Sequence, residues 1–136
     1  MKLNIRKIQH DDWDTLVSWW LEWRYWKVAP PKDFLPDNGT GGFMVEKNGI
    51  PIVSGFLYFT NSQGVLLEWI VSNPNYRDND RKDAIILLID TAEEFIKKQG
   101  KSYIFSIGRN KHLIKIHKKL GYSVDEKPSY EIIKTI

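Results

Sequence analysis

The segment that decides the fold runs from Val65 to Gly100 and begins with Val65-Leu66-Leu67-Glu68-Trp69-Ile70-Val71, which reads as an apolar strand. A polar segment follows it, Asn73-Pro74-Asn75-Tyr76-Arg77-Asp78-Asn79-Asp80-Arg81-Lys82. Apolar residues then recur at helical spacing, at Ile85, Leu88, Ile89, Ala92, Phe95 and Ile96. This spacing predicts an amphipathic helix that Asp80 can cap and that Gly100 ends. We therefore expect a strand, a polar loop and a long helix in this order.

The neighbouring segments extend this unit into a mixed sheet. Residues 103–107 form a short, mostly apolar segment, as expected for a strand that is buried on both faces. With this strand, residues 65–107 become a strand–helix–strand unit, and we expect its two strands to be parallel. Before this unit, residues 42–46 and 52–60 read as strands joined by Lys47-Asn48-Gly49, and Asn-Gly is typical of a tight hairpin.

The two ends of the chain complete the predicted order of elements. Residues 3–8 alternate between apolar and polar side chains, as in a strand. A helix is expected to follow from Asp11 or Asp12 to about Trp23. Near the other end we expect a helix capped by Asn110 and ended by Gly121, then two short strands at residues 122–125 and 130–134. The sequence thus predicts an α/β (α+β) fold over residues 1–136. Its single domain has a mixed, mostly antiparallel sheet with helices on both faces.

Composition excludes several classes of site and partner. The chain of 136 residues contains no cysteine and three scattered histidines, so we expect no disulfide, no cysteine nucleophile and no metal site. The net charge of +3 is only mildly basic, and solvated helix faces explain the lysine clusters, so no nucleic-acid partner is expected. The first residues lack the apolar block of a signal peptide, and no apolar run is long enough to span a membrane. We expect a cytoplasmic protein.

Two segments carry a resemblance to a known family, the GNAT superfamily of N-acetyltransferases. Members often read Pro-x-x-Arg-x-x-Gly-x-Gly/Ala in the loop before the long helix. Pro74 and Arg77 match this pattern here, whereas Asp80 and Lys82 occupy the glycine positions. Residues 110–122 are similar to the family's Asn-x6-Tyr-x3-Gly-Phe/Tyr element, with a histidine in place of the tyrosine. The order of predicted elements is similar as well, so the resemblance implies a GNAT fold across nearly the whole chain.

The resemblance implies acetyl-CoA as co-substrate. Free N–H groups at the start of the long helix can bind a phosphate, and basic side chains can add charge-assisted hydrogen bonds. The alternative is an ordinary helix start whose aspartates cap it and suit its dipole. The implied pantetheine contacts are Ile70, Val71 and Ser72. The other implied cofactor contacts are Arg77, Asp78, Asn79, Asp80, Arg81, Lys82 and Asn110.

Glu68 is the strongest candidate for a catalytic residue. It interrupts an apolar strand, and burial raises the pKa of a carboxyl group toward the range that suits a general base for an amine. The alternative is a glutamate that is paired or that points out of an open sheet face. The resemblance implies direct attack of the amine on the thioester, with His117 as the acid for the leaving thiolate and Tyr122 as a second donor. Each has a structural alternative, a half-buried helix residue for His117 and a core aromatic for Tyr122.

Five of the six tryptophans lie between residues 13 and 26. One helix face can bury Trp13, Leu16, Trp20 and Trp23. Trp19 and Trp26 share another face, which either lies under the loop of residues 30–36 or lines an acceptor pocket or a subunit contact. We include Trp19, Trp23 and Trp26 as candidate substrate contacts.

The sequence therefore predicts an N-acyltransferase that transfers an acetyl group from acetyl-CoA to a small-molecule or protein amine. The alternative is a GNAT-like binding or adaptor module that has lost catalysis and has lost or weakened its CoA binding. A homodimer is possible, because the second tryptophan face is apolar.

Overall fold

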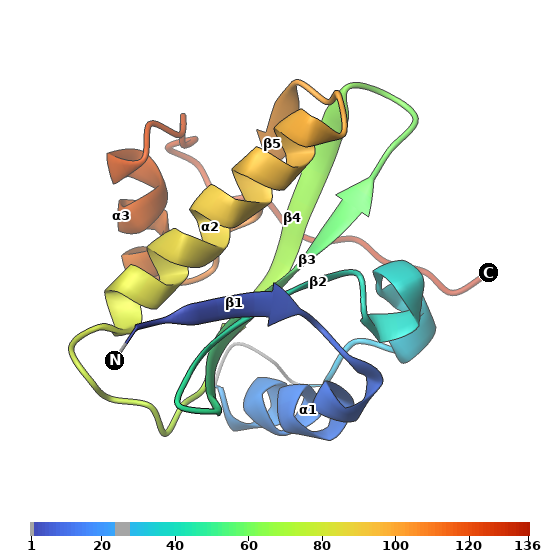
Figure 1. Ribbon diagram of the computed structural model, residues 1–136. Helices are drawn as coiled ribbons and strands as arrows, with labels where there is room; N and C mark the ends of the chain where they lie inside the picture. Colours follow the sequence, from blue (N-terminus) through green and yellow to red (C-terminus); the bar gives the residue numbers. More distant parts are fainter. Residues whose placement is uncertain (1, 24–27) are drawn as a thin grey trace.

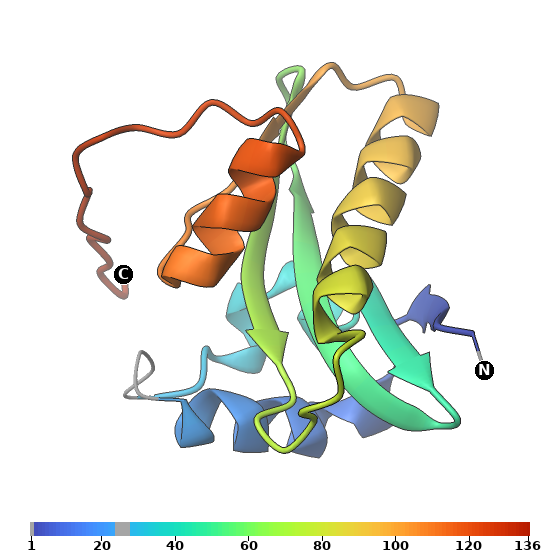
Figure 2. The ribbon, with the colours of Figure 1, turned by 90° about the vertical axis from the view of Figure 1, so that its left-hand side faces the viewer.

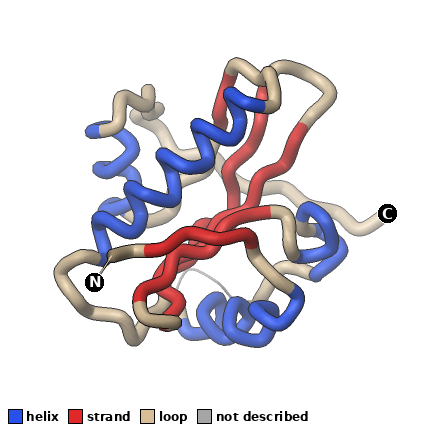
Figure 3. Tube along the Cα trace, viewed as in Figure 1, coloured by secondary structure: helices blue, strands red, loops and turns tan. Residues whose placement is uncertain are grey.

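The computed structural model describes residues 2–23 and 28–136 and shows one five-stranded sheet in the order β1-β2-β3-β4-β5 (Figures 1 and 3). The strands β1 to β4 pair antiparallel, and β4 and β5 pair parallel. Their bounds are Asn4–Lys7 for β1, Gly42–Lys47 for β2, Ile50–Phe59 for β3, Gly64–Ser72 for β4 and Tyr103–Phe105 for β5. The predicted mixed, mostly antiparallel sheet is confirmed.

Helices lie on both faces of the sheet, as predicted (Figure 2). The α-helices are α1 (Trp13–Glu22), α2 (Arg81–Lys98) and α3 (Lys111–Lys119), and the short 3-10 helices are η1 (His10–Asp12), η2 (Lys32–Phe34) and η3 (Pro36–Gly39). Helix α1 packs on one face, where Leu16 and Trp20 meet Met44 and Phe56. Helices α2 and α3 cover the other face, where Ile89 and Ile116 pack near Leu67. We call these the α1 face and the α2–α3 face.

Trp19 belongs to the core of the α1 face. Its side chain is 4% exposed and lies in the same cluster as Leu35, which comes from the segment that the sequence offered as a cover. The structure thus gives Trp19 the buried position that the sequence offered as the alternative to a substrate contact. Trp26, its predicted companion, lies outside the described residues.

The hairpin between β2 and β3 forms as Asn48-Gly49 predicts. Both residues have positive φ, +54° and +75°, which is the backbone that a two-residue hairpin turn requires and that Asn and Gly adopt most readily.

Strand β4 contains a β-bulge that changes the direction of the side chains toward its carboxyl end. Phe56 of β3 lies opposite Glu68, but Ser54 lies opposite Val71, so two residues of β4 face the single residue between Ser54 and Phe56. Trp69 within this bulge has a φ of +58°, which is uncommon for a residue with a bulky side chain. The bulge redirects the side chains of β4 next to the site described below.

Strands β4 and β5 separate soon after they pair. The parallel ladder covers only residues 64–66 of β4 and 103–105 of β5. Beyond it two side-chain hydrogen bonds join the diverging chains, from Ser106 Oγ to the Leu67 carbonyl (2.7 Å) and from the Ile107 N–H to Glu68 Oε1 (2.9 Å). A gap in the sheet therefore opens at the carboxyl end of β4.

Two predictions about the last third of the chain are wrong. Strand β5 has three residues, and Tyr103 and Phe105 are 69% and 60% exposed, because alternate residues of a strand face opposite sides and Ile104 is the one that packs against the core. The two predicted C-terminal strands do not form in the described structure, where residues 122–136 are irregular. Their alternating, β-branched sequence favours a strand locally, but a strand needs a hydrogen-bonding partner, and the three residues of β5 offer a short edge.

Candidate functional site

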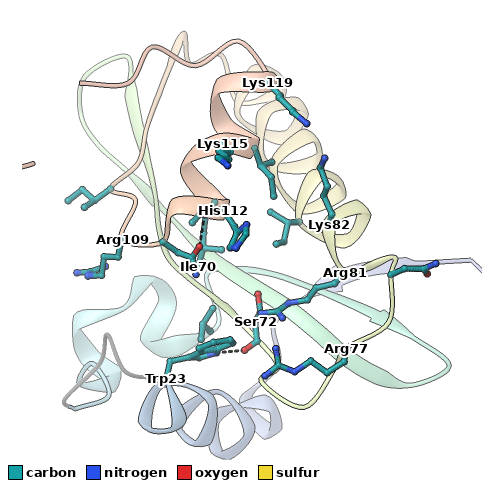
Figure 4. A pocket seen from close by; sticks show the side chains of 17 residues that line it. Trp23, Ile70, Ser72, Arg77, Arg81, Lys82, Arg109, His112, Lys115 and Lys119 are labelled. Carbon is teal, nitrogen blue, oxygen red and sulfur yellow. Dashed lines mark hydrogen bonds between the residues drawn. The ribbon is translucent and has the colours of Figure 1, made fainter. Parts of the chain in front are cut away.

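A cavity of about 630 Å³ lies where β4 ends and where α2 and α3 begin (Figure 4). Its apolar lining consists of Ile70, Val71, Ile85, Ile107, Leu113 and Ile116. Six cationic side chains also line it, those of Arg77, Arg81, Lys82, Arg109, Lys115 and Lys119. None of the lining residues that the structure describes is an aspartate or a glutamate. The cavity thus combines an apolar wall with a strongly positive one.

The start of helix α2 faces this positive wall. The first N–H that bonds in the helical i to i−4 pattern is that of Ala84, which donates to the Asp80 carbonyl at 3.0 Å. The N–H groups of Lys82 and Asp83 precede it, so they have no acceptor within the helix and can bind an anion. The partial positive charge of the helix N-terminus adds to that of the side chains.

The acids of the loop are held away from the cavity. The Asp80 carboxylate accepts hydrogen bonds from Lys47 Nζ of β2 (2.8 Å) and from the Tyr76 hydroxyl (2.7 Å). The Lys47 ammonium lowers the pKa of Asp80, and Asp80 raises the pKa of Tyr76 to about 12. Asp78 also acts on Lys47 and Tyr76 by its charge. The loop's bases therefore line the cavity, whereas Asp78 and Asp80 do not.

The loop keeps an ordinary backbone without the family's glycines. Asp80 has φ −89° and ψ 6°, and no residue between Asn73 and Asp83 has a positive φ. The conformation of the loop therefore does not require glycine at residue 80 or 82. Lys82 instead directs its side chain along the cavity toward α3 (Figure 4).

The cations of the cavity repel one another. Burial and the charge of Arg77 lower the pKa of Arg81, and the Lys82 ammonium lowers the pKa of Lys119 on the facing helix. The Arg81 guanidinium lies over the Trp23 ring at 5.4 Å, and Trp23 Nε1 donates to the Ser72 carbonyl at 2.7 Å. This carbonyl is therefore already bonded to an indole, although the sequence assigned Ser72 to the pantetheine arm. An anion between α2 and α3 would relieve the repulsion.

Glu68 lies at the gap between β4 and β5. Its side chain is 8% exposed, and because its partner Phe56 belongs to the α1 face, Glu68 points to that face as well. Burial raises its pKa to about 7, against the smaller lowering effects of the Ile107 N–H and the Arg109 charge. Ile107 donates to Glu68 and also lines the cavity. The Glu68 side chain itself is not part of the cavity lining, and Ile107 is the residue that connects the two.

The two candidate acids lie elsewhere. His117 is 5% exposed, its Nδ1 is 2.9 Å from the Leu113 carbonyl, and its ring packs edge-on against Tyr122 at 4.8 Å. The Tyr122 hydroxyl donates to Glu93 Oε2 of α2 at 2.8 Å, and burial raises its pKa. Neither side chain lines the cavity. The structure brings His117 and Tyr122 together with each other but not with Glu68.

The structure places most of the predicted cofactor contacts in the cavity. Its lining includes Ile70, Val71, Ser72, Arg77, Asn79, Arg81, Lys82 and Asn110, together with Trp23, but neither Asp78 nor Asp80. The Asn110 side chain caps α3 as predicted, since it accepts the His112 N–H at 2.7 Å.

Sequence reasoning missed the contribution of α3 and of the segment before it, namely Ile107, Arg109, His112, Leu113, Lys115, Ile116 and Lys119, and it missed Ile85 of α2. A signal was present, because Lys115 and Lys119 are four residues apart and therefore share a helix face. The lysine pattern was instead interpreted as a solvated surface. Among the described residues, no three His, Asp or Glu side chains are grouped so that they could hold a metal ion, and no helix has the length and apolarity needed to cross a membrane.

Comparison with known proteins identifies the fold. No protein-family model matches the sequence, and no curated protein does. Among solved structures, the ribosomal-protein-alanine N-acetyltransferase from Brucella melitensis biovar Abortus 2308 superposes with a TM-score of 0.70 at 14% identity, over 98% of this chain and all of that one. The ribosomal-protein-S18-alanine N-acetyltransferase from Escherichia coli gives 0.69 at 15% identity, over 88% of this chain and 77% of that one.

A third neighbour is an aminoglycoside acetyltransferase. The structure of AAC(6')-Iy with the bisubstrate analogue CoA-S-monomethyl-acetylneamine gives a TM-score of 0.63 at 18% identity, over 99% of this chain and all of that one. The chain therefore has the fold of the GNAT N-acetyltransferases, as the two sequence segments predict. By their names, the Brucella protein acts on a ribosomal protein and AAC(6')-Iy acts on aminoglycosides.

Proposed function

We propose that this protein is an acyl-CoA-dependent N-acyltransferase that transfers an acetyl group from acetyl-CoA to an amine. One observation carries the proposal: Ile107, which lines the cavity with the positive wall, donates its N–H to Glu68, a buried carboxyl group whose pKa is about 7. A general base with such a pKa can accept a proton from an amine at neutral pH.

The cavity suits both parts of CoA. Phosphate groups carry negative charge and accept hydrogen bonds, and the six cations and the free N–H groups of α2 provide both kinds of partner. The apolar lining residues suit the pantetheine arm. Burial and the charge of Arg77 lower the pKa of Arg81, and Lys82 lowers the pKa of Lys119, so these cations lie close enough to act on one another. A bound anion would therefore interact with several cations at once.

The proposed reaction needs no covalent enzyme intermediate. The amine nitrogen bonds to the thioester carbonyl carbon, the carbon–sulfur bond breaks, and Glu68 takes the proton that the nitrogen loses. The thiolate leaves and is protonated by water. Glu68 acts directly or through one water molecule.

Thermal unfolding with and without acetyl-CoA tests the first half of the proposal. At about a hundred times Kd, a ligand that binds only the folded state should stabilise it by roughly 2.7 kcal/mol. For a chain of this length that is an increase in Tm of about 10 °C. The control is Lys98→Glu, which changes an exposed cation of α2 outside the cavity and should keep the shift. No shift in Tm at millimolar acetyl-CoA would reject cofactor binding.

The alternative, a binding or adaptor module without catalysis, is distinguished by turnover. Release of free CoA in the presence of an amine panel is easy to measure here, because the chain has no cysteine thiol to react with a thiol reagent. A Tm shift with acetyl-CoA but no CoA release for any amine would favour the binding module.

Tyr122→Phe tests whether the tyrosine hydroxyl is a catalytic acid. Because this hydroxyl bonds to Glu93 and does not line the cavity, we expect kcat to stay within about threefold of wild type. The lost hydrogen bond should lower the free energy of unfolding by about 1 kcal/mol. A loss of kcat of about 100-fold, the lower end for general acid catalysis, would return Tyr122 to the reaction.

A further inference from the structure

One residue of the cavity lining, Arg109, belongs to an ion pair whose charges act on the proposed base. Arg109 pairs with Glu131, which comes from the irregular C-terminal segment. Arg109 lines the cavity but points away from the cluster formed by Arg77, Arg81, Lys82 and Lys119 (Figure 4). Arg109 is thus separate from the proposed phosphate site.

Arg109 is held by a chain of contacts that begins at Trp69 of β4. Its guanidinium lies over the Trp69 ring at 5.7 Å, and Trp69 Nε1 donates to the Tyr58 hydroxyl at 2.9 Å. The Tyr58 hydroxyl in turn donates to the Phe34 carbonyl at 3.1 Å, and the Phe34 and Trp69 rings meet at 6.0 Å. The cation therefore rests on an aromatic group at the β4 bulge, and its Nη2 donates to Glu131.

The carboxylate that occupies Arg109 is held weakly. Its neighbours Tyr130 and Ile132 are 91% and 94% exposed. In the described structure, residues 123–136 form no strand and belong to no part of the sheet. The Glu131 side chain is 39% exposed and the Arg109 side chain 23%, and ion pairs that water reaches add little to stability, so the carboxylate of a ligand could take the place of Glu131 on Arg109 without disturbing the core.

Arg109 and Glu131 both lie within electrostatic range of the base. Ile107, two residues before Arg109, donates its N–H to Glu68. The charge of Arg109 lowers the pKa of Glu68, and the charge of Glu131 raises it. A ligand carboxylate on Arg109 would therefore be held a short distance from the proton acceptor.

We propose that Arg109 binds a carboxylate group of the acceptor, so that the acceptor is an amine with a carboxylate a few bonds from its nitrogen, and that Glu131 occupies this position in its absence. This rests on the proposed function, because only amine acylation has an acceptor. The guanidinium fork matches a carboxylate in shape and charge. Arg109 is a specificity residue, since it orients the acceptor and takes no proton.

Matched pairs of acceptors test the proposal. Aminoalkanoates with two to five carbons between nitrogen and carboxyl carbon are compared with the corresponding amides, by CoA release at saturating acetyl-CoA. We expect the acids to exceed the amides in kcat/KM by about 10- to 100-fold, the value of a hydrogen-bonded charge. Arg109→Gln should bring this ratio close to one, and Arg109→Lys should keep part of it. Glu131→Gln should lower KM for the acids about two- to fivefold.

Two control variants remove equivalent charges elsewhere, Lys118→Gln on the exposed side of α3 and Glu126→Gln in the C-terminal segment. Both should leave the ratio as in wild type. An acid-to-amide ratio near one in wild type, or an unchanged ratio in Arg109→Gln, overturns the proposal. If neutral amines are acylated in that case, the proposed function itself still stands.

A binding measurement keeps the test independent of turnover. Because Arg109 lies over Trp69, 4-aminobutyrate that binds Arg109 should change the tryptophan fluorescence of wild type in a saturable way and should not do so in Arg109→Gln. If wild type shows neither turnover nor this change, the proposal is overturned, and if acetyl-CoA also fails to shift Tm, the proposed function fails separately.

Discussion

Replacement of Glu68 by glutamine is expected to lower kcat about 10²- to 10⁴-fold, the range attributed to general acid–base catalysis. Glutamine keeps the size of the side chain and its acceptor oxygen for the Ile107 N–H, but it cannot take a proton from an amine. The measurement is CoA release with any amine that wild type acylates. Glu94→Gln, an exposed carboxylate of α2, is the matched control and should keep wild-type turnover.

The pH dependence gives Glu68 a second signature. With a pKa of about 7, the carboxyl group is mostly protonated below neutral pH and cannot act as a base, so activity should rise with pH through about 7. This rise should be absent from the residual activity of Glu68→Gln. If the variant keeps wild-type turnover and the same pH profile, another group is the base.

The same carboxyl group should affect stability with a definite sign. Its pKa is higher in the folded protein than the ordinary value of 4.5, so the folded state binds the proton more tightly than the unfolded state. This contribution to stability is fully present below pH 4.5 and is lost as the pH rises to about 7. Urea unfolding at several pH values should therefore show a decline over this range that Glu68→Gln lacks.

Reversal of two charges at the positive wall is expected to have the second large effect. In the double variant Lys82→Glu and Lys119→Glu, the affinity for CoA should fall about 10²- to 10⁴-fold, if each lysine contributes one charged hydrogen bond to a phosphate. The two ammonium groups face each other across α2 and α3, and two carboxylates there would repel a phosphate. Isothermal titration with CoA at fixed ionic strength measures the change.

The matched control reverses the same number of charges on the same helix. Lys97 and Lys98 lie in the last turn of α2, far along the helix from its N-terminus, and both are exposed. The variant Lys97→Glu and Lys98→Glu therefore has the same net charge but should bind CoA as wild type does. Equal losses in both double variants would mean that net charge, and not this wall, governs affinity.

Much of the fold could be predicted because its signals are local. The apolar run of β4, the helical spacing of α2 and the Asn48-Gly49 turn each specify an element through residues close in sequence, and all three form. The C-terminal strands fail for the complementary reason. Their pattern is equally clear, but a strand depends on a partner that the local sequence does not contain.

The candidate site shows the same division. Glu68 could be selected because a carboxylate in an apolar strand stands out, and the structure gives it the raised pKa that burial implies. The separation of basic from acidic side chains in the loop could not be predicted. Three acids and three bases cancel in the sequence between residues 77 and 83, and only the fold brings Lys47 to Asp80, 33 residues away, so that the bases alone face the cavity.

His117 marks a limit of the family pattern. It occupies the tyrosine position of the motif, yet its ring lies against Tyr122 and outside the cavity. A match in sequence register gives a residue's place along a helix, but the direction of the side chain depends on how that helix is rotated against its neighbours.

The early separation of β4 and β5 means that a bound ligand could act as part of the sheet. A parallel ladder that stops after three pairs leaves β4 beyond Leu66 without a strand on the side of β5 in the described structure, although β3 still pairs with its other edge. An extended, hydrogen-bonding chain such as pantetheine could lie along this edge, as an added strand does. The bound co-substrate would then serve as the missing length of the fifth strand, and the sheet would be complete only while the reaction is in progress.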